Sequence, residues 1–118
     1  MQDNAIDENT FKSIQELMGD NFSVMIEKYK ESTAEYFVEM DAGMSENDAQ
    51  RVQNAAHPFK SSSASLGFMA VSEIAKQVEK QAEEAAQTGG AVDAVQGDVA
   101  QLKEAYANVM SYLETLNL

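Results

Sequence analysis

Apolar side chains recur at steps of three and four along most of this chain, with polar side chains between them. That spacing places the apolar residues on one face of an α-helix. Five segments show the pattern, at about residues 7–18, 20–41, 45–66, 70–87 and 92–116. No run of Val, Ile, Thr and aromatic residues alternates with the period of two that a half-buried strand requires. The pattern therefore predicts an all-α protein.

The breaks between these segments fall at glycines, and only Gly97 falls in or near the start of a predicted helix. The glycines at the breaks are Gly19, Gly43, Gly67, Gly89 and Gly90. Four long helices joined by short connections favour an antiparallel up-down four-helix bundle. We expect the short first helix to lie across one end of this bundle, and one domain to span residues 5–117.

Capping residues refine two of the helix boundaries. Asp7 is a suitable N-cap for the first helix, because its carboxylate accepts hydrogen bonds from N–H groups of the first turn. Ser45, with Asp48 three residues on, forms a variant of the capping box and predicts the start of the third helix. The residues that the first helix is expected to turn inward are Phe11, Ile14, Leu17 and Met18.

The third helix carries the only histidine of the chain, His57. The predicted inward seam of this helix consists of Val52, Ala56, Phe59, Ser63 and Leu66. At about 100° per residue, His57 lies roughly 140° from the middle of that seam. The imidazole therefore points outward, with Lys60 on the neighbouring row.

The neighbours of His57 are small, which is unusual for an exposed helix face. They are Ser61, Ser62, Ala64, Ser65 and then Gly67. Serine has a low helix propensity, and exposed faces usually carry Glu, Lys or Gln. Small side chains would allow the surface of another protein to approach the ring. From these residues alone two interpretations stay open, an ordinary surface histidine and a reactive one.

Composition narrows the function classes. The chain has 118 residues, with 20 acidic and 8 basic side chains and a formal net charge of -12. This charge disfavours nucleic acid and anionic membranes, since affinity for phosphates comes mainly from Lys and Arg. The absence of cysteine excludes disulfides and thiolate metal sites. With no membrane-length apolar run and no signal peptide after Met1, we expect a soluble cytoplasmic protein, and Met1 favours a free-standing one.

The segment from Ala56 to Gly67 resembles the signature of histidine-containing phosphotransfer (HPt) domains. That signature is a histidine, an apolar residue two positions on, a lysine three positions on, a run of small residues and an apolar residue followed by glycine. The matching residues are His57, Phe59, Lys60, Ser61 to Ser63, Leu66 and Gly67. The resemblance covers essentially the whole chain, and it implies an up-down four-helix bundle, often with an extra N-terminal helix.

Two residues depart from the family pattern. Ser61 stands where many members have glycine, and it is still small enough to let a partner approach. Pro58 removes a backbone donor from the helix interior and clashes one turn back. We expect a kink or a loosened turn just before His57.

The resemblance implies a phosphorelay intermediate that has no ATP site and no autonomous catalysis, and so is not an enzyme. A neutral imidazole nitrogen of His57, expected to be Nε2, would accept a phosphoryl group from a receiver-domain aspartate and pass it to another. Lys60 would offset the phosphoryl charge. By similarity to chemotaxis-kinase phosphotransfer domains, Glu79 would orient the ring through Nδ1. Three other side chains of the fourth helix lie near enough to compete for that role: Lys76, Gln77 and Glu83.

The resemblance also implies a docking face for receiver domains of a hybrid sensor kinase and a response regulator. Its expected residues are Ser61, Ala64, Ser65, Gly67 and Phe68, with exposed parts of the second helix between Tyr29 and Glu39. The receiver would bind Mg²⁺, and this chain would need no cofactor or metal. The complex is expected to be weak and transient, and the protein to be a monomer.

Three other function classes are less well supported by the sequence. The main rival is a non-enzymatic helical binding module with an incidental histidine. A metalloprotein bundle is disfavoured, because one histidine among scattered carboxylates is a poor ligand set. A metal-independent hydrolase is disfavoured, because no nucleophile, base and orienting group are recognisable together.

Overall fold

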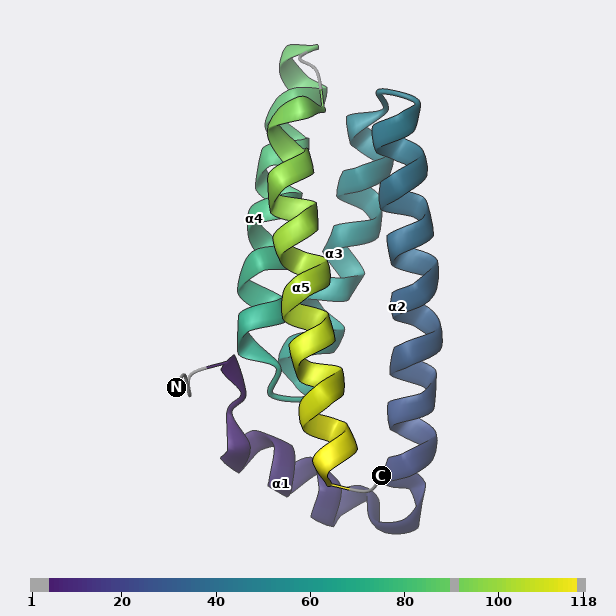
Figure 1. Ribbon diagram of the computed structural model, residues 1–118, viewed down its shortest axis with the longest axis vertical. Helices are drawn as coiled ribbons and strands as arrows, with labels where there is room; N and C mark the ends of the chain where they lie inside the picture. Colours follow the sequence, from purple (N-terminus) through teal and green to yellow (C-terminus); the bar gives the residue numbers. More distant parts are fainter. Residues whose placement is uncertain (1–4, 90–91, 117–118) are drawn as a thin grey trace.

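The structure is a computed structural model that describes residues 5–89 and 92–116. Its elements are α1 (Glu8–Met18), the short 3-10 helix η2 (Gly19–Asn21), α2 (Phe22–Ser45), α3 (Ala49–Ser65), α4 (Met69–Thr88) and α5 (Asp93–Thr115). Helices α2 to α5 run alternately up and down, and α1 lies across the end at which α2 begins and α5 ends (Figure 1). The predicted all-α bundle with an extra N-terminal helix is confirmed, and the described residues contain no strand. The predicted domain end at residue 117 and the break at Gly90 lie outside the described residues.

The predicted cap of the first helix is confirmed, whereas the predicted start of the third helix is wrong. Asp7 accepts a hydrogen bond from the backbone N–H of Thr10 at 3.3 Å. Helix α2 continues through Gly43 to Ser45, and α3 begins at Ala49 with Asp48 as its N-cap.

Gly43 serves close packing between two helices and does not end a helix. A Cβ atom at Gly43 would lie 2.7 Å from Cγ2 of Val52 and 2.9 Å from the backbone oxygen of Asp48. The turn between α2 and α3 is made instead at Asn47, which has a φ of 56°. A glycine inside the helical pattern was thus mistaken for a terminator, because sequence does not distinguish a helix end from a close helix contact.

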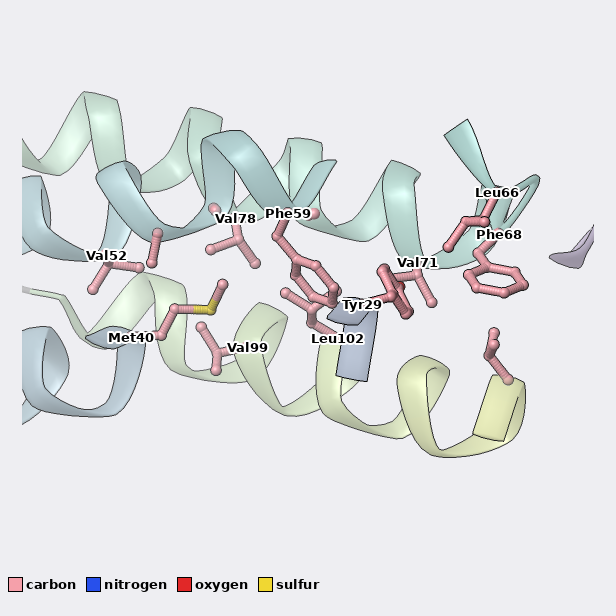
Figure 2. Close-up of a cluster of buried hydrophobic side chains, with 14 of the residues drawn as sticks. Tyr29, Met40, Val52, Phe59, Leu66, Phe68, Val71, Val78, Val99 and Leu102 are labelled. Atoms are coloured by element: carbon pink, nitrogen blue, oxygen red, sulfur yellow. The ribbon is translucent and has the colours of Figure 1, made fainter. Parts of the chain in front are cut away.

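The seam predicted for α3 is fully confirmed, since all five of its residues are at most 3% exposed. Phe59 projects from α3 into the middle of the core, near Tyr29 and Leu102 (Figure 2). At the end of the bundle, Phe11 of α1 packs edge-on against Phe22, with ring centroids 5.3 Å apart. The buried seam therefore holds one face of α3 against the core, and the opposite face of the helix is exposed to solvent.

Leu17 was predicted to face inward, and this is wrong, because its side chain is 79% exposed. Helix α1 covers only the end of the bundle, so it buries fewer of its apolar side chains than a helix packed along the bundle axis. Phe11 is its one buried residue.

Among the described residues, no helix is long and apolar enough to cross a membrane.

Candidate functional site

His57 lies on the outward face of α3, as its position opposite the buried seam predicts. Its side chain is 66% exposed, whereas the adjacent Ala56 is completely buried. Helix α3 continues through Pro58 to Ser65, so the proline does not end the helix. Pro58 does remove the N–H group that would otherwise bond the carbonyl of Asn54. The ring is therefore presented by a helix whose backbone bonding is weakened at the next residue.

One carboxylate on α4 contacts two side chains of α3. Nδ1 of His57 lies 2.5 Å from Oε2 of Glu79, and Nζ of Lys60 donates to Oε1 of Glu79 at 2.7 Å. An ionised carboxylate only accepts hydrogen bonds, so Nδ1 is the donor in this pair. A neutral ring in this arrangement carries its proton on Nδ1 and leaves the lone pair on Nε2 free.

Glu79 is 18% exposed and remains ionised in the fold. Burial by itself would raise the pKa of this carboxyl. Hydrogen bonds from Lys60 and His57, together with their charges, outweigh burial and lower the pKa below its ordinary value. The carboxylate therefore keeps its charge and its acceptor role at neutral pH.

Of the four residues of α4 considered for the contact with His57, the structure brings Glu79 to the ring. The other three are exposed, and none of them hydrogen-bonds His57 within residues 5–89 and 92–116. These three are Lys76, Gln77 and Glu83. A further contact joins the two helices beside the site, because the hydroxyl of Ser72 donates to the backbone oxygen of Lys60 at 3.0 Å.

Two of the serines that follow His57 bond their hydroxyl groups to carbonyls of α3. The hydroxyl of Ser62 donates to the carbonyl of Phe59 at 3.2 Å, and that of Ser65 donates to the carbonyl of Ser61 at 3.0 Å. Such bonds return the polar hydrogen to the helix that carries it. The surface of this part of α3 therefore offers fewer free hydroxyl donors than its sequence indicates.

Ser63 is completely buried, and its Oγ lies 2.8 Å from the hydroxyl oxygen of Tyr29 on α2. Sequence reasoning placed Ser63 in the inward seam of its helix but missed this bond to Tyr29. A serine in the apolar seam of α3 opposite a tyrosine in the seam of α2 was the available signal, since buried hydroxyl groups need partners.

Two residues predicted to form the docking face are buried, and those predictions are wrong. Phe68 is completely inaccessible and packs against Phe11 and Tyr29, with ring centroids 5.9 and 5.3 Å apart. Gly67 is covered by the start of the chain, where its carbonyl accepts a hydrogen bond from the backbone N–H of Asp7 at 2.7 Å. Its φ of 85° follows the last turn of α3, as expected for a glycine past a helix end.

The remaining predicted docking residues lie at the surface. Ser61 and Ser65 are exposed and Ala64 is half-buried. On α2, by contrast, Tyr29 is only 5% exposed, so the accessible part of the predicted stretch begins beyond it. Within the described part of the chain, no three His, Cys, Asp or Glu side chains are grouped to hold a metal ion.

Residues 24–110 match the family model of the Hpt domain, which is more than half of the chain. The chain therefore belongs to the Hpt domain family. Its fold is similar to the crystal structure of histidine-containing phosphotransfer protein B (HptB) from Pseudomonas aeruginosa PAO1, with a TM-score of 0.86. The two sequences are 21% identical, and the match covers 97% of this chain and 95% of that chain. No curated protein sequence matches the chain significantly.

Membership of this family defines the general role of the chain as histidine phosphotransfer in a phosphorelay. Proteins of this family are phosphotransfer intermediates and not enzymes of the usual kind. The family model spans all of α3 and α4, which carry the site, and most of α2 and α5.

Proposed function

We propose that His57 accepts a phosphoryl group from a receiver-domain aspartate and passes it to the aspartate of another receiver domain. One observation carries this proposal: His57 is the only histidine of a phosphotransfer domain, and it is exposed with Nδ1 held by Glu79. The donor is the receiver of a hybrid sensor kinase and the final acceptor is that of a response regulator.

In the first step, the lone pair of Nε2 attacks the phosphorus of the phosphoaspartate. The N–P bond forms as the acyl P–O bond breaks, and the aspartate leaves as a carboxylate. The second step is the same exchange in reverse, with a new aspartate as the nucleophile. The contact with Glu79 supports the attack, because it holds the proton on Nδ1 and turns Nε2 toward the partner.

Lys60 offsets the charge of the transferred group. A phosphoryl group brings a charge of about -1.5 to -2 at neutral pH. The ammonium group of Lys60 already bridges to Glu79 at 2.7 Å, one helical turn from His57. It can therefore exchange one anionic partner for another without a movement of the backbone.

The receiver contributes the remaining chemistry. It supplies the reacting aspartate and the Mg²⁺ ion, whereas this chain binds neither ATP nor a cofactor of its own. The partner docks over Ser61, Ala64 and Ser65, where small side chains permit close approach. The chain works as a monomer in the cytoplasm, in transient complexes.

The test is transfer from a phosphorylated receiver domain to the purified chain. We expect acid-labile, base-stable phosphate on the wild type and none on His57→Gln. Because the ring is 66% exposed, the substitution should change the free energy of unfolding by no more than about 0.5 kcal/mol. Label that persists in a folded His57→Gln would refute the assignment. Absence of transfer from every receiver tried would favour a helical binding module with an incidental histidine.

A further inference from the structure

A groove runs between α2 and α3 beside the site. It has a volume of about 330 Å³. Five of its lining residues come from α2 and three from the end of α3 and the residue that follows it: Met25, Lys28, Tyr29, Ser32, Tyr36, Ser62, Ser65 and Leu66. Gly67 and Phe68, the two buried residues that were predicted to form the docking face, do not line this groove.

The wall that α3 contributes is apolar in spite of its serines. The hydroxyls of Ser62 and Ser65 donate to carbonyls of α3 itself, so neither offers its hydrogen to the groove. The hydroxyl of Tyr29, which belongs to the floor, is taken up by Ser63. An apolar side chain entering here would therefore leave no hydroxyl of these residues without a partner.

The charged residue of the groove is Lys28. It is exposed, and it forms no ion pair with any residue that the structure describes. In a chain with a net charge of -12, an unpaired cation beside an apolar groove favours a partner that presents a carboxylate at that point.

The groove lies within the area that a partner at His57 must cover. At 1.5 Å per residue, Ser61 and Ser65 follow His57 by about 6 and about 12 Å along α3. A typical protein interface covers about 800 Å² on each side, which corresponds to a radius of about 16 Å. Glu79 and Lys60 occupy the α4 side of His57, and the groove occupies the α2 side.

We propose that this groove receives one apolar side chain of the receiver domain, whose neighbouring carboxylate pairs with Lys28. This inference rests on the proposed function and gives it a defined anchor. The residues that determine partner choice are then Ser62, Ser65 and Lys28, while His57, Lys60 and Glu79 carry the chemistry.

Ser65→Leu tests the anchor by filling the groove, and Ser111→Leu on the exposed face of α5 is the matched control. The donor is an isolated receiver domain, phosphorylated with acetyl phosphate, that phosphorylates the wild type. We expect Ser65→Leu to raise KM about tenfold with kcat unchanged, as for loss of one interface anchor. Phosphoramidate, a small donor that needs no docking, should label Ser65→Leu and the wild type at equal rates.

Lys28→Glu provides an independent variant at an exposed position. It should raise KM and make the rate of transfer from the receiver less sensitive to salt. Wild-type KM values for both variants would overturn the groove proposal while leaving the role of His57 as phosphoryl acceptor intact. Slower labelling of Ser65→Leu by phosphoramidate would also overturn it, because the substitution would then act on His57. No transfer to the wild type from any receiver would instead remove the proposed function itself.

Discussion

Replacing Ser63 with alanine removes the partner of a buried tyrosine hydroxyl. Ser63 is completely buried and Tyr29 is 5% exposed, so no bulk water can replace the lost oxygen. The hydroxyl of Tyr29 keeps its proton at neutral pH, since burial raises its pKa. The variant therefore leaves a buried donor unsatisfied between α2 and α3.

The loss of stability depends on whether one or both hydroxyl groups of the Ser63–Tyr29 pair are removed. An unsatisfied buried hydroxyl costs about 1–3 kcal/mol, so we expect Ser63→Ala to lower the free energy of unfolding by about 2 kcal/mol. Tyr29→Phe should cost only about 0.5–1.5 kcal/mol, because the serine hydroxyl can turn to a carbonyl of its own helix. The double variant leaves no orphaned group and should cost about 1 kcal/mol, less than Ser63→Ala alone.

Urea unfolding followed by circular dichroism measures all four proteins in one double-mutant cycle. For a chain of this length, 2 kcal/mol corresponds to a fall in Tm of about 8 °C. Additive effects of the two substitutions would refute the reasoning. So would a Ser63→Ala protein as stable as the wild type, because the hydroxyl of Tyr29 would then have another partner.

Two further predictions concern Gly67 and Glu79. Gly67→Ala should lower the free energy of unfolding in urea more than Gly89→Ala does. Both glycines have positive φ, but only at Gly67 would the new Cβ lie 2.7 Å from the carbonyl oxygen of Asp7. Equal losses of unfolding free energy in the two variants would contradict this. Because the pKa of Glu79 is lowered in the fold, its carboxylate stabilises the protein above the pKa of the unfolded carboxyl, and this is lost as pH falls through the folded pKa. The Tm difference between wild type and Glu79→Gln should therefore shrink as pH falls below the ordinary pKa of a glutamate and through the lowered pKa of Glu79, and a constant difference would exclude the mechanism.

The periodic pattern predicted the helices because burial follows helical spacing closely in a simple bundle. The seam of α3 is the clearest case, since each predicted residue from Val52 to Leu66 is buried. Errors arose where one residue type has two uses. The glycine pattern predicts a helix end at Gly43, which instead allows close contact with Val52. The apolar spacing predicts that Leu17 is core, but α1 packs only across the bundle end and leaves it exposed.

The outward position of His57 could be predicted from its own helix, because the angle from the seam depends on α3 alone. Its contact with Glu79 depends on the register between α3 and α4, which helical periodicity does not specify. Resemblance to a family provided that register, and the structure places the carboxylate at the ring. It did not indicate that Lys60 shares the same carboxylate, nor that Tyr29 holds Ser63.

The serine run explains how an accessible histidine can be combined with a stable helix. Serine lowers helix propensity because its hydroxyl competes for backbone groups, and three serines in succession follow Lys60. Here that competition is confined, since Ser62 and Ser65 bond within α3 and Ser63 bonds Tyr29 across the core. Larger side chains would favour the helix but would close the surface beside His57. Small residues, with the hydroxyls of Ser62 and Ser65 bonded within α3, keep that surface open. The buried seam that includes Phe59 supplies the stability that the low helix propensity of serine does not provide.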